Sequence, residues 1–377
     1  MKPFKKLVLA ATVFAFTSTV HAQDQPIRVA IVGLVHGHVT GFLHNLPSHP
    51  DITVVGVSEP DDALRQQTIR TSHLPANIFY ASEAEMLHAT HPQAILVYTS
   101  PAGHRAAIEA AAPLHISAMV EKPLATTVED ALAIQRLAQR YNINVLTNYE
   151  TTWYASNIAA ADMLAAGQIG DLRKLVVHDG HRGPKEIGVG PEFLNFLTDP
   201  KLNGGGALFD FGCYGADLTT WINHGQLPLT VTAVTLQIKP QIYAKVDDDS
   251  TVILTYPKSQ TILQGSWNWP FDRKDMEVYG ATGYIDTVYI DTMHTDQLRV
   301  RLPRERAEHP QTAPALASPQ DDSLHYLAAV LNGNLHPQGD LTALDTNIAV
   351  VRILDAARRS AATGRTIHLA DEAARRK

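Results

Sequence analysis

The feature that most constrains the fold is a regular alternation of short apolar segments with helical ones between residues 27 and 147. Near-continuous apolar strands separated by helices are typical of a parallel sheet covered on both faces, which is the doubly wound α/β arrangement. The predicted strands are 27–33, 53–58, 94–98, 117–121 and 144–147. The predicted helices between them are 39–46, 61–71, 83–89, 102–112 and 127–141.

After about residue 148 the pattern changes to strands that follow one another directly, which predicts a second, α+β domain with a mostly antiparallel sheet packed on helices. We therefore divide the chain into domains at 27–147 and 148–377. The expected strands are 230–239, 250–256, 261–267, 275–279, 284–286 and 298–301, followed by a long surface loop at 303–320. The expected helices are 156–166, 207–223, 322–332 and 341–363.

The first 22 residues differ from the rest of the chain. Three lysines precede an apolar run at 7–20, and Val20-His21-Ala22 places small residues at the positions that a signal peptidase reads. The run is shorter than the roughly 20 residues of a membrane span. We expect a signal peptide at 1–22, cleaved after Ala22, and a periplasmic mature protein without a membrane anchor. A retained N-terminal anchor is the alternative.

Removing that segment takes away three Lys and no acid, so the chain shrinks from 377 to 355 residues and its formal charge falls from −7 to −10. An acidic chain with scattered Lys and Arg does not predict a nucleic-acid partner. A single cysteine, Cys213, cannot form an internal disulfide. The 45% of hydrophobic residues supply ample material for a core, which excludes a disordered chain.

The first strand ends in the loop Gly33-Leu34-Val35-His36-Gly37-His38. A glycine here allows a tight turn that brings backbone N–H groups and a helix N-terminus towards a pyrophosphate. The dinucleotide fingerprint has glycine at its first, third and sixth places, and this loop supplies only the first, with Val35 third. We predict that Gly33, Val35, His36 and Gly37 contact a dinucleotide; an ordinary strand-turn-helix is the alternative.

Glu59 ends the second strand. An acid at that place can accept hydrogen bonds from an adenosine ribose and repels the 2′-phosphate of NADP, so NAD is the expected cofactor. A solvated acid before a turn is the alternative.

The histidines His36, His38 and His44 suggest a metal, but the sequence around them holds no carboxylate or cysteine that would complete a ligand set. We therefore expect no metal site there.

Further motifs carry a resemblance. Thr99-Ser100-Pro101, His104, Glu121-Lys122-Pro123, the segment 204–214 and the C-terminal 364–367 together resemble the Gfo/Idh/MocA oxidoreductases. The resemblance implies a Rossmann domain, a second domain with an open antiparallel sheet, and a nicotinamide cofactor between them. It also implies a set of cofactor-binding residues: Thr99, Pro101, His104, Glu121 and Lys122. An open sheet face makes a homo-oligomer through the C-terminal sheet the expected assembly.

Three residues are the candidate catalytic groups. Lys122 stands at the carboxyl end of a buried parallel strand, where open α/β sheets bind ligands, and a partly desolvated lysine can have a lowered pKa. Asp210 and Tyr214 are four residues apart at the start of a helix, which places them on one face. The alternatives are a structural pair of Lys122 with Glu121, and a core aromatic at Tyr214.

The segment 179–186 groups polar residues around glycines on an expected loop facing the cleft, and we predict that His181 and Arg182 bind substrate. The aromatic residues Trp153, Tyr154, Trp267 and Trp269 could stack on sugar faces, although each alone could serve packing. Taken together they favour a sugar or a polyol as substrate.

The leading hypothesis is an NAD-dependent oxidoreductase that acts on a secondary alcohol of a sugar or polyol, with Tyr214 as acid/base assisted by Lys122 and Asp210. Outside the cytoplasm free NAD is scarce, so the cofactor would be tightly bound. An NAD-dependent glycoside hydrolase is an alternative that also needs no free NAD. In such an enzyme the bound NAD transiently oxidises a sugar hydroxyl, the glycosidic substituent is eliminated, and the NAD is then regenerated. A non-catalytic periplasmic sugar-binding protein is the third reading.

Overall fold

The computed structural model describes residues 26–288 and 295–369, so the predicted signal peptide lies outside the described residues. The first half forms a six-stranded sheet in the order β3-β2-β1-β4-β5-β6, and all its neighbouring strands are parallel. This confirms the predicted doubly wound sheet. The strands are β1 (Ile27–Val32), β2 (Ile52–Ser58), β3 (Phe79–Tyr80), β4 (Ala94–Val97), β5 (Ser117–Glu121) and β6 (Val145–Asn148).

Helices α2, α3 and α5 of this half begin at residues whose side chains cap them. The side chains of Asp61, Ser82 and Thr127 each accept a hydrogen bond from a backbone N–H in the first turn of the helix that follows. The helix expected at 102–112 is shorter, because 3-10 turns occupy its two ends. The helices are α1 (His38–Asn45), α2 (Asp62–Thr71), α3 (Glu83–Thr90), α4 (His104–Ala111) and α5 (Val128–Tyr141).

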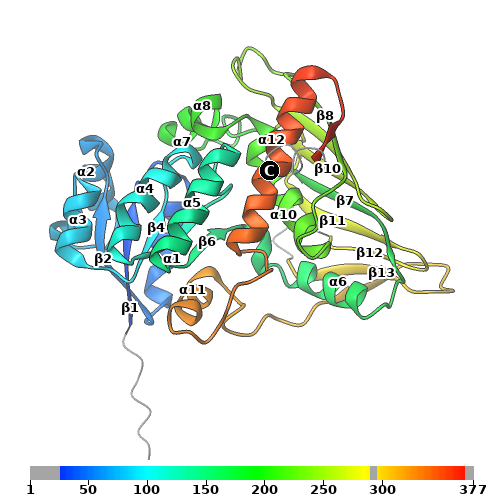
Figure 1. Ribbon diagram of the computed structural model, residues 1–377, viewed down its shortest axis with the longest axis horizontal. Coiled ribbons are helices and arrows are strands. Elements are labelled where there is room, and N and C mark those ends of the chain that lie inside the picture. The colour runs from blue at the N-terminus through cyan, green and yellow to red at the C-terminus, as the bar shows by residue number, and fades with distance from the viewer. Residues whose placement is uncertain (1–25, 289–294, 370–377) are drawn as a thin grey trace, which may run out of the picture.

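The second half builds a nine-stranded sheet in the order β14-β13-β12-β11-β7-β10-β9-β8-β15 (Figure 1). Its neighbours are antiparallel except for β7 and β10, which run parallel. The first four strands in chain order are β7 (Leu172–Gly180), β8 (Thr230–Leu236), β9 (Asp249–Thr255) and β10 (Gln260–Ser266). The others are β11 (Arg273–Gly280), β12 (Tyr284–Asp286), β13 (Gln297–Arg301), β14 (His309–Thr312) and β15 (Ile367–His368).

Three expectations for this half were wrong in detail. The predicted loop at 303–320 contains β14, whose four residues are all exposed and so show no alternation of apolar and polar positions. Asp179 belongs to strand β7 and not to a loop. The helix expected at 207–223 is two helices, because Phe211 departs from helical geometry and Tyr214 N–H bonds to the Phe211 carbonyl, three residues back.

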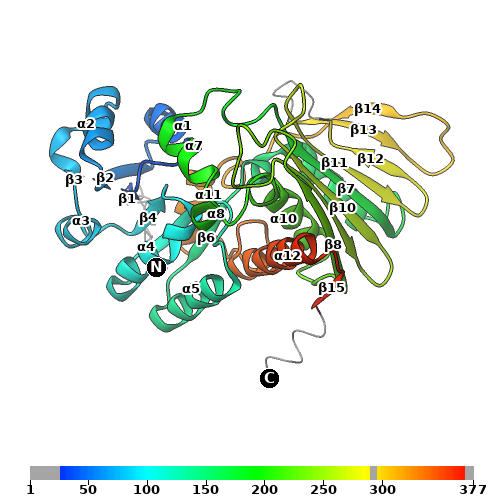
Figure 2. The ribbon, with the colours of Figure 1, turned by 90° about the horizontal axis from the view of Figure 1, so that it is seen from above.

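Helices α9, α10 and α12 contact one face of the nine-stranded sheet, on the side towards the first sheet (Figure 2). No helix among the described residues is long and apolar enough to cross a membrane. The helices of this half are α6 (Ala155–Ala165), α7 (Pro191–Leu197), α8 (Pro200–Asn203), α9 (Ala207–Asp210), α10 (Gly212–Ile222), α11 (Ser323–Leu331) and α12 (Leu344–Thr363).

The C-terminal helices serve both sheets. Helix α12 contacts α5 and β6 on one side and α10 and β8 on the other. Ile348 and Val351 of α12 belong to one hydrophobic cluster of the first sheet, and Leu324 and Leu327 of α11 belong to another. The region assigned from the sequence to a second domain therefore also completes the core of the first.

Candidate active site

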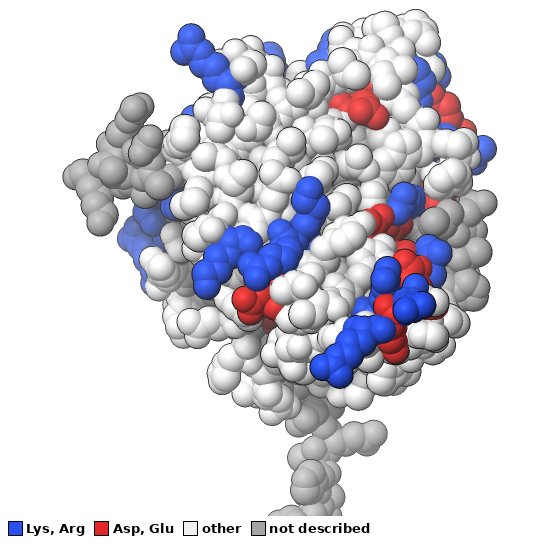
Figure 3. Space-filling view, turned by 90° about the vertical axis from the view of Figure 1, so that its right-hand side faces the viewer, with Lys and Arg blue, Asp and Glu red and all other residues white. Residues whose placement is uncertain are grey.

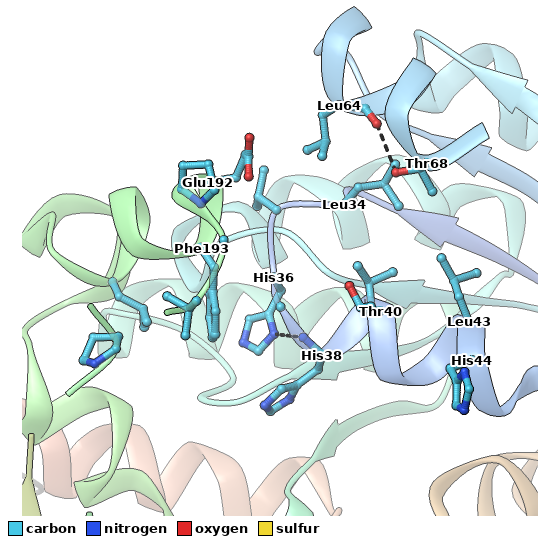
Figure 4. A pocket seen from close by; sticks show the side chains of 18 of the residues that line it. Leu34, His36, His38, Thr40, Leu43, His44, Leu64, Thr68, Glu192 and Phe193 are labelled. Atoms are coloured by element: carbon cyan, nitrogen blue, oxygen red, sulfur yellow. Dashed lines mark hydrogen bonds between the residues drawn. The ribbon is translucent and has the colours of Figure 1, made fainter. Parts of the chain in front are cut away.

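A cavity of about 990 Å³ lies at the carboxyl edge of the first sheet, where doubly wound folds bind ligands. Its walls come from the β1–α1 loop, from α1 and α2, from the segment 184–193 that leads into α7, and from residues of the second sheet (Figure 4). Lys122, His181, Asp210, Tyr214 and Lys274 line the cavity together. The fold thus brings four of the predicted catalytic and substrate-binding residues to one place and adds Lys274.

The β1–α1 loop has a glycine requirement at two positions. Gly33 has φ +78°, and a Cβ there would lie 2.7 Å from the Thr99 methyl group, so only glycine fits. A Cβ on Gly37 would lie 2.6 Å from the Phe193 ring. Val35, His36 and Gly37 line the cavity beside the start of α1. A tight glycine turn, a helix N-terminus and a long cavity are what a dinucleotide requires, so these residues fit NAD.

Glu59 holds this loop in place. Its buried carboxylate accepts the backbone N–H of Leu34 at 2.8 Å and that of Asp61 at 2.9 Å. It therefore joins the loop after β1 to the turn after β2, a role that the sequence did not reveal. Contact with a ribose stays a prediction.

The centre of the site is a buried ion pair between the two halves of the chain. Lys122 Nζ lies 2.6 Å from Asp210 Oδ1 and donates to the Asp210 carbonyl at 3.0 Å, while Trp267 Nε1 donates to Asp210 Oδ2 at 2.9 Å. Burial alone would lower the pKa of Lys122, but the charge and hydrogen bond of Asp210, together with other nearby negative groups, outweigh it and the pKa is raised. The expectation of a lowered lysine pKa was therefore wrong, as was the alternative pairing with Glu121.

Asp210 shows the reciprocal effect. Burial would raise its pKa, but the charge and hydrogen bond of Lys122 lower it to about 2. Both groups are therefore charged at neutral pH.

Tyr214 lies between two ammonium groups. Its buried ring has Lys122 Nζ 5.0 Å and Lys274 Nζ 4.8 Å from the ring centroid. Burial, together with the nearby charge of Glu150, raises the pKa of Tyr214 well above its usual value. The phenol is therefore protonated at neutral pH and can act as a proton donor.

Lys274, Glu150 and Asp179 form a part of the site that sequence reasoning missed. Lys274 and Glu150 make a short ion pair, and Tyr154 donates to Glu150 at 2.6 Å. Asp179 lies beside Lys274 in the β7–β11 register, and one of its buried carboxyl oxygens has no hydrogen-bond partner. Burial raises its pKa well above the usual value. These contacts depend on the pairing of β7 with β11, for which the sequence carries no signal.

His36, His38 and Glu121 form a hydrogen-bonded cluster at the floor of the cavity. Glu121 Oε2 lies 3.0 Å from His38 Nδ1 and 3.9 Å from His36 Nε2, so the statement that no carboxylate lies near these histidines was wrong. His36 Nδ1 accepts the backbone N–H of His38 at 3.3 Å (Figure 4). This contact favours the neutral tautomer with its hydrogen on Nε2. One donor atom from each of the three side chains lies within 4.8 Å of the others, so the expectation of no metal at these histidines stays a prediction.

The other predicted residues lie outside the cavity wall. Thr99 packs under Gly33, Pro101 is buried, and His104 Nδ1 bonds to the Leu124 carbonyl at 3.2 Å, so these three support the loops. Arg182 is exposed beside the cavity.

Neither Trp153 nor Trp267 is placed to stack on a sugar. Trp267 is fully buried against Tyr243. Trp153 donates to Asn148 at 3.0 Å and packs on Tyr326.

The fold and the site define a dinucleotide-binding α/β protein with an acid/base cluster. Two sequence models match it: the oxidoreductase family with an NAD-binding Rossmann fold over residues 27–149, and the GFO/IDH/MocA C-terminal domain over residues 158–286. The chain therefore belongs to the Gfo/Idh/MocA family of oxidoreductases.

Relatives of known activity are distant. A dTDP-3,4-didehydro-2,6-dideoxy-alpha-D-glucose 3-reductase from Saccharopolyspora spinosa is 26% identical over 55% of this chain and 58% of its own length. The human trans-1,2-dihydrobenzene-1,2-diol dehydrogenase is 25% identical over 61% of this chain and 64% of its own length. These matches span less than two thirds of each relative. The aldose-aldose oxidoreductase of Caulobacter crescentus, solved with glycerol, has a TM-score of 0.77 and 19% identity, covering 91% of this chain and 100% of its own.

The buried ion pair predicts a dependence of stability on pH. A carboxylate whose pKa is lowered by folding stabilises the fold above its unfolded pKa, and this contribution is lost as the pH falls from about 5 towards 2. In Asp210→Asn less stability is lost over this pH range, because the titrating carboxylate is gone. The free energy of unfolding at pH 7 drops by about 3 kcal/mol, because the charge of Lys122 remains buried without its partner. Urea denaturation at several pH values measures both effects.

The matched control is Asp62→Asn, which removes an acid that is 73% exposed and changes stability by less than about 1 kcal/mol. Equal pH slopes for wild type and Asp210→Asn would contradict the assigned role of the pair.

Proposed function

We propose that the chain is an NAD-dependent oxidoreductase that interconverts a secondary alcohol of a sugar or polyol and the corresponding ketone. The observation that carries this proposal is the meeting of Lys122, Asp210 and Tyr214 in the cavity onto which the glycine loop opens. The names of the relatives, a sugar reductase and a diol dehydrogenase, support a hydroxylated substrate.

The cofactor is held, on this proposal, by the loop of Gly33, Val35, His36 and Gly37 together with the start of α1. When bound, the nicotinamide supplies hydride chemistry. The protein's part is to place the substrate carbon and to manage its hydroxyl proton. The charged Glu121, held by His36 and His38, borders this region, and Lys122 follows it directly.

Tyr214 is the proton donor in the proposed reaction. Its protonated phenol donates to the carbonyl oxygen that is being reduced, and it must accept a proton in the opposite direction. The ammonium groups of Lys122 and Lys274 stabilise the phenolate that forms in the donating step. Asp210 keeps Lys122 fixed and charged.

We also propose that the protein is exported and retains its cofactor. The basic start and apolar run of residues 1–22 support export. Phe193 of α7 packs on His36, with ring centroids 4.7 Å apart, and closely covers Gly37. A segment lying over the dinucleotide loop in this way slows exchange of a bound cofactor, which suits a compartment with little free NAD.

We propose that the protein assembles as a homo-oligomer through the uncovered face of the nine-stranded sheet. Val234 of β8 is 61% exposed and Leu236 is 54% exposed, and the half-buried Ile253 and Ile262 lie on the same face. The side of the molecule that carries this sheet shows broad uncharged areas between groups of Lys and Arg (Figure 3). Exposed apolar faces of this kind are typical of subunit contacts.

Cofactor and mechanism are tested together. The purified protein, denatured and analysed by mass spectrometry, is expected to release NAD. Tyr214→Phe keeps the bound NAD and loses about 100-fold or more in turnover in a screen of aldoses, polyols and their keto forms, because the proton donor is gone. Tyr279→Phe, a change at an exposed tyrosine of β11, is the control and keeps full turnover.

A Tyr214→Phe variant with wild-type turnover would refute the assigned role. Absence of NAD, together with failure to bind added NAD, would favour the sugar-binding reading. Release of an aglycone from glycosides without added NAD would point to the glycoside hydrolase.

The assembly is tested by light scattering. Wild type is expected to be oligomeric, and the double change Val234→Lys with Leu236→Lys shifts it to monomer because two charges then face the contact. Leu202→Lys, which changes an apolar residue of α8 that is 40% exposed, is the control and leaves the mass unchanged. A monomeric wild type would exclude this interface.

A further inference from the structure

A second group of potential metal ligands lies away from the catalytic cluster. His49 follows the 3-10 turn Leu46–Ser48 behind α1, Asp322 is the N-cap of α11, and His325 lies in the first turn of that helix. One donor atom from each lies within 4.8 Å of the others. The group thus joins segments that are far apart in the sequence.

Hydrogen bonds hold the Asp322 carboxylate, the His325 ring and the backbone of His49. Asp322 Oδ1 accepts the N–H groups of Leu324 at 2.7 Å and of His325 at 3.0 Å, which leaves Oδ2 to face the histidines. The His325 ring is hydrogen-bonded to Asp321 Oδ1 at 2.9 Å. The backbone of His49 lies between two turn hydrogen bonds, from its own N–H to the Leu46 carbonyl and from the Ile52 N–H to its carbonyl.

One donor of the group is unsatisfied without a ligand, while His325 Nδ1 is hydrogen-bonded to Asp321 Oδ1. His49 Nδ1 is buried and has no hydrogen-bond partner, and the carboxylate oxygen it faces, Asp322 Oδ2, is 3.8 Å away, beyond hydrogen-bond range. Three negative charges, on Asp51, Asp321 and Asp322, act on His325. Two imidazoles among three carboxylates form a site that favours a divalent cation.

The distances are close to those of a zinc site. Zinc bonds of about 2.0 to 2.1 Å in a tetrahedron place the ligand atoms roughly 3.3 Å apart. Here His325 Nδ1 lies 3.0 Å from Asp322 Oδ2 and 2.9 Å from Asp321 Oδ1. His49 Nδ1 lies 3.8 Å from Asp322 Oδ2, and one donor atom from each of the three residues lies within 4.8 Å of the others, so the group contracts when it binds the ion.

We propose that His49, His325 and Asp322 bind one Zn²⁺ ion, with a water molecule in the fourth position. The site is structural. It joins the end of α1, whose residues line the cavity, to the start of α11, whose leucines belong to the core of the first sheet. Imidazole nitrogens with carboxylate oxygens are a common zinc ligand set.

The test is Zn²⁺ binding by the full, chelator-treated protein, measured by competition with a chromogenic chelator and by the melting temperature. We expect one Zn²⁺ per chain and a higher melting temperature with the metal. His49→Gln and His325→Gln each weaken binding at least about tenfold. Asp322→Asn, whose amide oxygen can still cap α11, also weakens it.

Two controls locate the ion. His309→Gln alters a histidine of β14 that pairs with Glu305, and this variant is expected to keep full Zn²⁺ binding. His38→Gln alters the histidine cluster beside the cavity and is also expected to keep full Zn²⁺ binding. Equal melting temperatures of the metal-free variants and of metal-free wild type show that the loss is not unfolding.

Three results would overturn the proposal: no binding at 100-fold excess of Zn²⁺ over protein, binding unchanged in His49→Gln and His325→Gln, or binding lost in His38→Gln alone. The last result would place the ion in the cavity. None of these readouts needs the enzyme's substrate, so they stand apart from the proposed oxidoreductase activity.

Discussion

The ion pair of Lys122 with Asp210 is the interaction on which the arrangement of the site depends. It links the end of β5 to the end of α9, 88 residues further along the chain, and Trp267 of the second sheet closes it from the other side. A buried ion pair adds little net stability to the fold, because both charges lose their hydration. Its effect here is positional: it fixes a strand end, a helix end and the ring of Tyr214 around one point.

Most of the fold could be predicted from local sequence. The strands of the first sheet are apolar runs that end at turns, and their predicted bounds lie within one or two residues of those observed; Ser117–Glu121 was predicted without error. The elements without predicted bounds include β7 and α7, and the others are short or exposed. Strands β3 and β15 have two residues each, and β14 has no buried residue, so none of them shows a hydrophobic pattern.

The site could be predicted only in part. Lys122 follows from the rule that ligands bind at the carboxyl ends of parallel strands, and Asp210 and Tyr214 came from a family motif. The position of Lys274 depends on which strands pair, and the raised pKa of Lys122 depends on a partner 88 residues away. For Trp267 the prediction from sequence was wrong, because this aromatic residue, of a type common in sugar sites, is fully buried and donates to Asp210.

The packing of α11 and α12 has a consequence for the order in which the molecule can form. Ile348, Val351, Leu324 and Leu327 complete the two hydrophobic clusters of the first sheet, yet they are among the last parts of the chain to be synthesised. The core of the N-terminal sheet is therefore completed only after the C-terminal helices have been made and have docked. Leu34 of the dinucleotide loop belongs to the same cluster as Leu324 and Leu327, so the packing around this loop is completed only then.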